Sequence, residues 1–215
     1  MEEEHTHHLA TMYRHMKKHV VQHGFQGEIE WQASLSLEKV SESDFLRESA
    51  WVVLASGFRE SVLRHKFGSI SDAFLNWSSA QDIAEHNDTC RENALAVFRN
   101  ERKIDAIVTI AERVAGEGFE SIRGRIGQDG IPFLLELPYI GPITAFHLAK
   151  NLGVPAVKPD RHLVRITKAA GYASPEDLCQ EISILTGDSI SVIDLVMWRY
   201  ATLNPAYETD VVAAR

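Results

Sequence analysis

Apolar residues along this chain recur mostly three and four positions apart, which is the period of an amphipathic helix. The clearest face begins at Ile104 and continues through Ile107, Val108, Ala111 and Val114. No stretch of useful length alternates apolar with polar residues, as a half-buried strand would. The pattern therefore predicts an all-α protein with short loops.

Capping residues and glycines divide this pattern into separate helices. Ser43 or Asp44 can serve as the N-cap of one helix, Asp160 is a good N-cap for another, and Gly171 closes it. Between the first two predicted helices, Gly24 and Gly27 predict an extended segment. The predicted helices span residues 8–21, 45–56, 58–67, 71–77, 79–86, 91–98, 104–115, 142–152, 161–170, 174–185 and 189–203.

One run, LPYIGPITAFHLAKNLGVPAVKPDRH at residues 137–162, places two Pro-containing turns close together. The first turn ends at Gly141 and leads into a predicted helix, and the second delivers Asp160, 19 positions after Gly141. A glycine before a helix lets the backbone approach a phosphate closely, and the first helical amides are free to bind it. This contact uses peptide dipoles more than charged side chains.

LPYIGPITA followed by KPDRH resembles the helix-hairpin-helix-GPD superfamily of base-excision DNA glycosylases, whose hairpin reads L-P-G-hydrophobic-G-x-x-T-A. The resemblance continues more faintly from about Phe45 to about Asn204. It implies two helical lobes with the hairpin at the cleft between them. On this resemblance we expect residues 43–145 to form the helical barrel lobe and 1–42 with 146–215 to form the other, with the hairpin, 137–152, spanning the junction.

The resemblance assigns catalysis to Asp160. Breaking the bond between a base and deoxyribose creates positive charge at C1′, and a fixed carboxylate stabilises that charge and orients or deprotonates the attacking water. Amides at the start of a helix can hold such a carboxylate in place. The residues expected to contact DNA are Tyr139, Gly141, Ile143, Thr144, Lys150 and Arg161.

A glycosylase also has to extrude its target nucleotide and hold the base in a pocket. Trp31, in the expected extended segment, is the first candidate to stack on that base. Phe58 and Arg59 are candidates to fill the gap left in the duplex or to line the pocket mouth, and 87–89 is a candidate second probe. A core position is the competing interpretation for Trp31 and Phe58.

Three departures from the superfamily pattern narrow the expected chemistry. The position of the Schiff-base lysine of bifunctional members is Ile143, so we expect hydrolysis by water with no lyase activity. Cys90 and Cys179 are the only cysteines, too few for the four-cysteine iron–sulfur loop, and no cofactor is expected. Tyr139 replaces the first glycine of the hairpin. No metal ion is expected, although the resemblance is compatible with a monovalent cation bound by the carbonyls of the hairpin.

The resemblance implies a DNA partner, which the net charge of −8 disfavours. The charge is uneven, however, because residues 137–172 carry five Lys and Arg side chains and a single acid. His15, His19 and His23 share a helix face, but no further ligands complete a metal site, and a solvated helix is the preferred interpretation. The acidic start, MEEEHTHH, and the lack of a long apolar stretch predict a cytoplasmic protein, which we expect to be a monomer.

The leading hypothesis is thus a monofunctional DNA glycosylase that acts on double-stranded DNA and leaves an abasic site. Its substrate is an abnormal base, either an alkylated purine or a bulky modified cytosine of phage DNA. The superfamily serves both genome repair and, in some prokaryotic proteins, defence against phage. The alternative hypothesis is a non-catalytic helix-hairpin-helix module that recognises DNA structure.

Overall fold

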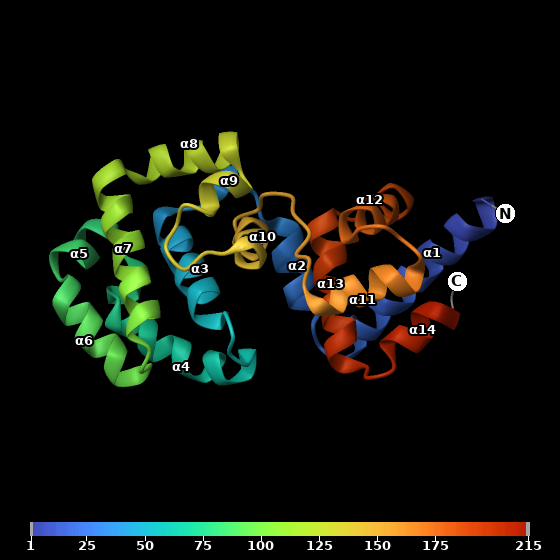
Figure 1. Ribbon diagram of the computed structural model, residues 1–215, viewed down its shortest axis with the longest axis horizontal. Helices are drawn as coiled ribbons and strands as arrows, with labels where there is room; N and C mark the ends of the chain where they lie inside the picture. The colour runs from blue at the N-terminus through green and yellow to red at the C-terminus, as the bar shows by residue number, and fades with distance from the viewer. Residues whose placement is uncertain (1, 214–215) are drawn as a thin grey trace. The chain divides into compact units, whose positions relative to one another are not determined.

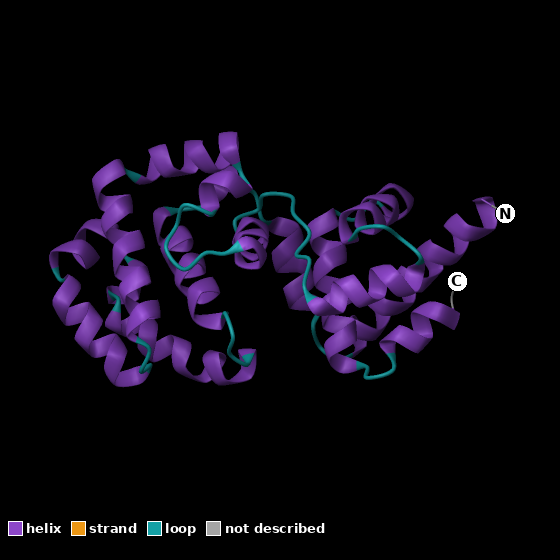
Figure 2. Ribbon diagram, viewed as in Figure 1, coloured by secondary structure: helices purple, strands orange, loops and turns teal. Residues whose placement is uncertain are grey.

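The computed structural model describes residues 2–213, with side chains from His8 onward. All regular elements in that range are helices, as Figure 2 shows, so the predicted all-α fold is confirmed. The chain groups into two compact units, Met1–Leu35 with Pro155–Arg215 and Ser36–Val154. The boundaries between the units fall after Leu35 and Val154, whereas those expected from the sequence fall after residues 42 and 145. The entire 137–152 hairpin belongs to the second unit.

The first unit is built around α13 (Ile190–Leu203), most of whose residues are buried. Helices α1, α2, α11 and α12 all pack against it, and α14 packs on α11. Apolar side chains from these helices form one core. The other helices of the unit, labelled in Figure 1, are α1 (Glu2–Gln22), α2 (Gln26–Ser34), α11 (Arg161–Ala170), α12 (Pro175–Thr186) and α14 (Tyr207–Ala213).

The expected extended segment around Trp31 is wrong, because this residue lies in helix α2. Gly24 does break the chain, with a φ of +87°, but Gly27 sits in the first turn of α2 and does not interrupt it. Tertiary contacts hold the short helix in place. Arg199 of α13 makes a bidentate ion pair with Glu28, with Nη2–Oε1 and Nε–Oε2 distances of 2.9 and 3.0 Å.

The second unit contains α3 (Glu42–Ala55) and α7 (Glu101–Glu117), which pack against each other. The predicted face of α7 is buried, as expected. Helix α10 packs on α3 and on α9, and α8 packs on both α7 and α9. The remaining elements are η1 (Leu37–Lys39), α4 (Glu60–Ala73), η2 (Leu75–Trp77), α5 (Ala80–Glu85), α6 (Asn87–Val97), α8 (Phe119–Asp129), α9 (Ile131–Leu134) and α10 (Pro142–Asn151).

Several helix boundaries in this unit differ from the sequence prediction, and α8 was not predicted. Ser41, instead of Ser43 or Asp44, is the N-cap of α3, because its hydroxyl and the Asp44 carboxylate cap each other's backbone amides. Helix α4 continues through Gly68, which the helix tolerates in its interior. Helix α6 already begins at Asn87, so the candidate probe at 87–89 lies on a helix and not in a loop.

Candidate nucleic-acid interface

The hairpin of the second unit consists of α9, a tight turn and α10. Gly141 is the N-cap of α10, and Thr144 closes this end of the helix: its Oγ1 accepts a hydrogen bond from the Gly141 N–H at 2.7 Å and donates to the Gly141 carbonyl at 3.0 Å. Pro142 has no N–H group, so the amides of Ile143 and Thr144 are the first-turn donors without an intrahelical acceptor. These two amides, and not that of Gly141, are therefore available to an anion.

The protein itself does not require glycine at position 141. Its φ of −104° is open to any residue. A Cβ placed there would meet only Thr144 Oγ1, at an ordinary contact distance of 3.9 Å. A role that explains the glycine is close approach of an external group to the backbone.

Tyr139, which stands where the superfamily pattern has the first hairpin glycine, adopts a left-handed backbone conformation with a φ of +65°. Glycine adopts this region freely, whereas a bulky residue there is an outlier. Its side chain is 43% exposed, as is that of Ile143 in the first turn of α10. The hairpin thus presents an aromatic ring and an aliphatic side chain to solvent beside the two free amides.

Lys103 of α7 joins the hairpin to a second predicted DNA-contact segment, and sequence reasoning missed it. Its ammonium lies 5.3 Å from the centre of the Tyr139 ring and 4.8 Å from that of Phe58. The lysine is only 2% exposed, and it donates to the carbonyls of Val53, Leu54 and Ser56 at the end of α3. Burial lowers the pKa of Lys103 to about 8. The spacing of Lys103 in the sequence could have revealed its burial, because Lys103 precedes Ile107 by one helical turn and so lies on the buried face of α7.

Asp160 lies in the first unit as the N-cap of α11, as predicted. Its Oδ1 accepts hydrogen bonds from the amides of His162 at 2.9 Å and Leu163 at 3.1 Å. Among the described residues, Oδ2 has no hydrogen-bond donor. The half-buried carboxylate therefore has one oxygen held by the helix and one left for another group.

His162 and Tyr207 form a polar pair beside this carboxylate, and neither was predicted. His162 Nδ1 lies 3.3 Å from the Tyr207 hydroxyl, and Arg161 Nε donates to His162 Nε2 at 3.4 Å. Because Nε2 accepts this bond, the neutral ring carries its proton on Nδ1. Burial lowers the pKa of His162, while the Asp160 carboxylate raises it. Tyr207 belongs to α14, a helix that the sequence pattern did not predict.

The remaining residues that were predicted to contact DNA or the base differ in their exposure to solvent. Arg161 is exposed at the start of α11, and both Phe58 and Arg59 are exposed in the loop between α3 and α4. Trp31 is exposed on α2 in the first unit. Lys150, in contrast, is only 6% exposed in α10, which argues against a direct phosphate contact.

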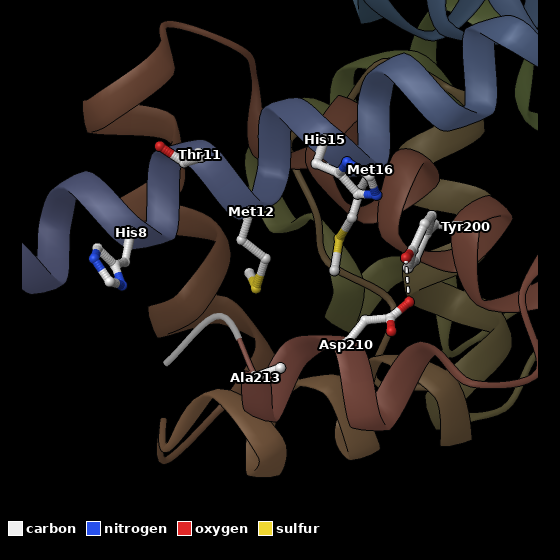
Figure 3. A pocket seen from close by; sticks show the side chains of 8 residues that line it. All are labelled: His8, Thr11, Met12, His15, Met16, Tyr200, Asp210 and Ala213. Carbon is white, nitrogen blue, oxygen red and sulfur yellow. Dashed lines mark hydrogen bonds between the residues drawn. The ribbon is translucent and has the colours of Figure 1, made fainter.

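A pocket of about 460 Å³ opens in the first unit between α1, α13 and α14. Figure 3 shows Met12 and Met16 on one side, with Tyr200 donating a hydrogen bond of 2.7 Å to Asp210 on the other. His15 also lines it, and the pocket contains none of the predicted site residues. Among the side chains described, no group of three or more His, Cys, Asp or Glu residues could hold a metal ion.

Comparisons with protein-family models, with curated proteins and with solved structures found no match to this chain. None of the described helices has both the length and the apolar character required to cross a membrane.

Proposed function

We propose that this protein is a monofunctional DNA glycosylase, in which Asp160 supports hydrolysis of the bond between an abnormal base and its deoxyribose. The observation that carries the proposal is the state of this carboxylate, with Oδ1 held by two helix amides and Oδ2 open. Such an anion does not have to reorganise when positive charge develops at C1′, and preorganisation is the main source of electrostatic catalysis.

In the proposed reaction, the C1′–N bond breaks and its electron pair leaves with the base. A cationic alkylated purine leaves as the neutral base, whereas a modified cytosine leaves as an anion and takes up a proton from solvent. The oxygen of a water molecule then bonds to C1′, and the water proton passes to Oδ2 of Asp160 or to solvent. The products are the free base and an abasic site. Ile143 supports this route, because its side chain offers no amine for a covalent intermediate.

The hairpin supports a double-stranded DNA partner. Ile143 and Thr144 offer amide donors for a phosphate, Gly141 leaves room for it, and Tyr139 exposes an aromatic ring next to them. Arg161, next to Asp160, adds an exposed cation. These groups contact the sugar-phosphate backbone and carry no base specificity. The substrate remains an alkylated purine or a hypermodified cytosine, and the setting that we propose is a cytoplasmic monomer.

The test compares Asp160→Asn with Glu208→Gln, which removes a nearby exposed carboxylate from α14. Asparagine caps a helix as well as aspartate does, so the variant is expected to fold and to bind DNA like the wild type. Release of bases from a panel of alkylated, deaminated, oxidised and phage-type DNAs is measured by mass spectrometry. We expect Asp160→Asn to release the base at least about 10²-fold more slowly and Glu208→Gln to be unaffected.

The alternative, a DNA-structure module without catalysis, is favoured by one observation: the amides, Gly141 and Tyr139 all lie in the second unit, which does not contain Asp160. This alternative predicts DNA binding with no base released from any substrate. Base release by Asp160→Asn at the wild-type rate would refute the proposed mechanism.

A further inference from the structure

Two segments of the second unit meet at one buried ammonium. Phe58 lies in the loop between α3 and α4, and Tyr139 lies in the hairpin turn, far away in sequence. The centres of their rings are 4.8 and 5.3 Å from Lys103 Nζ, within the range of a cation–π contact. We call Lys103, Phe58 and Tyr139 the Lys103 clamp.

The ammonium is well placed to hold both segments. Its three hydrogen bonds go to the carbonyls of Val53, Leu54 and Ser56, at the negative end of the α3 dipole. Removing a cation from water is costly unless its donors are satisfied, and here all three are used. The two rings therefore meet a cation whose position is fixed by the backbone of α3.

The Tyr139 backbone gives an independent reason for this contact. A φ of +65° is unfavourable for tyrosine, and such strain persists only when the surroundings stabilise it. Glycine would relieve the strain but has no ring to place over Lys103. Phe58 also contacts Phe98, and the centres of the two rings lie 4.9 Å apart.

We infer that Lys103 is a positioning residue for DNA binding, which couples the hairpin turn to the 56–59 loop so that both segments meet the duplex as one rigid surface. This inference rests on the proposed DNA partner. It gives the buried lysine a role beyond capping α3, and it explains why an aromatic residue occupies a glycine-type position. Phe58 and Tyr139 both keep exposed surface for the duplex.

A double-mutant cycle in DNA affinity tests the coupling. We expect Phe58→Leu and Tyr139→Leu each to weaken the affinity about threefold to tenfold, the scale of a cation–π contact. Because either change breaks the clamp, the double variant should be weaker by less than the product of the two factors. When Lys103 is replaced by Met, the losses of DNA affinity caused by Phe58→Leu and Tyr139→Leu should be independent, so that the two factors multiply. Tyr139→Leu combined with Val62→Ala, an exposed residue on α4, is the control pair and should be multiplicative.

Hydrogen exchange without DNA separates failure of the clamp from failure of the proposed function. We expect Lys103→Met to accelerate amide exchange in both 56–59 and 137–141, while α8 is unchanged. If Lys103→Met does not fold, Tyr139→Leu replaces it, and faster exchange in the 56–59 loop is the expected result. Unchanged exchange in the partner segment, or multiplicative effects in the wild-type cycle, would overturn the clamp. A wild-type protein that binds no DNA would refute the proposed function, and exchange would still decide the coupling.

Discussion

Thr144 and Gly141 form a closed local arrangement at the start of α10, in which one hydroxyl serves both the amide and the carbonyl of the N-cap residue. The hydroxyl bonds to the N-cap residue itself, and glycine has no side chain that could accept hydrogen bonds from the first helical amides. The amides of Ile143 and Thr144 are therefore free for an external anion. The arrangement connects the stability of the hairpin to its proposed phosphate contact.

Thr144→Val is expected to lower the free energy of unfolding by about 1 kcal/mol, the usual net effect of losing a hydrogen bond, here that of the hydroxyl to the Gly141 backbone. It should also weaken DNA binding, because the turn before α10 is no longer held. Thr144→Ser keeps the hydroxyl and serves as the control, with near-wild-type values for both. Urea unfolding and a DNA titration at fixed salt measure the two effects. Full DNA affinity in a destabilised Thr144→Val protein would contradict the proposed role of the hairpin.

Gly141→Ala should separate stability from binding. The backbone conformation and the 3.9 Å clearance both accept a methyl group, so we expect the free energy of unfolding to be unchanged or raised by up to about 1 kcal/mol. DNA affinity should fall, because the methyl group occupies the space between backbone and phosphate. Gly124→Ala, in the interior of α8 with no atom within 4 Å of the added Cβ, is the matched control and should leave DNA affinity unchanged. Equal DNA affinity of Gly141→Ala and the wild type would rule out the close approach.

Helix α11 shows which part of this architecture is local in origin. Its predicted and observed bounds agree because Asp160 caps one end and Gly171, with a φ of +85°, closes the other. Both signals act within a few residues of the helix end, so a single sequence contains them. The Asp160 carboxylate and its helix amides were predictable for the same reason.

Trp31 and Lys103 show what local signals miss. Helix α2 has weak propensity around Gly27, and the Glu28–Arg199 ion pair that holds it joins residues far apart in the chain. The three carbonyl partners of Lys103 come from the end of α3 and its C-cap residue, about 50 residues earlier. His162 meets Tyr207 through α14, a short helix that packs on α11. Periodicity places Lys103 on the buried face of α7, but the partners in these pairs depend on tertiary structure, so neither periodicity nor capping residues indicate them.

The half-buried position of His162 predicts how pH affects stability. Its pKa in the folded protein is lowered, mainly by burial, with Arg161 and Arg165 adding to the effect and Asp160 and Glu208 opposing it. The unfolded state therefore binds more protons as pH falls below about 6.5, the ordinary histidine value, so this contribution to stability is lost at acidic pH. We expect the wild type to lose more stability than His162→Gln between about pH 7 and 5. The His162 ring should titrate below 6.5 by NMR, and a midpoint above 6.5 would contradict the assignment.

Ile143 decides the class of chemistry in the proposed enzyme. Without an amine at this position, the wild type should give no covalent complex when it is mixed with abasic DNA and borohydride. Ile143 is exposed in the first turn of α10, so Ile143→Lys should fold. We expect it to gain a trapped complex, because the proposed phosphate contact at this turn would bring the new amine close to the adjoining sugar. Ile184→Lys, at an exposed position of α12, is the matched control and should trap nothing. A trapped complex with the wild type would show that another amine attacks the sugar, and hydrolysis by water alone would then be the wrong mechanism.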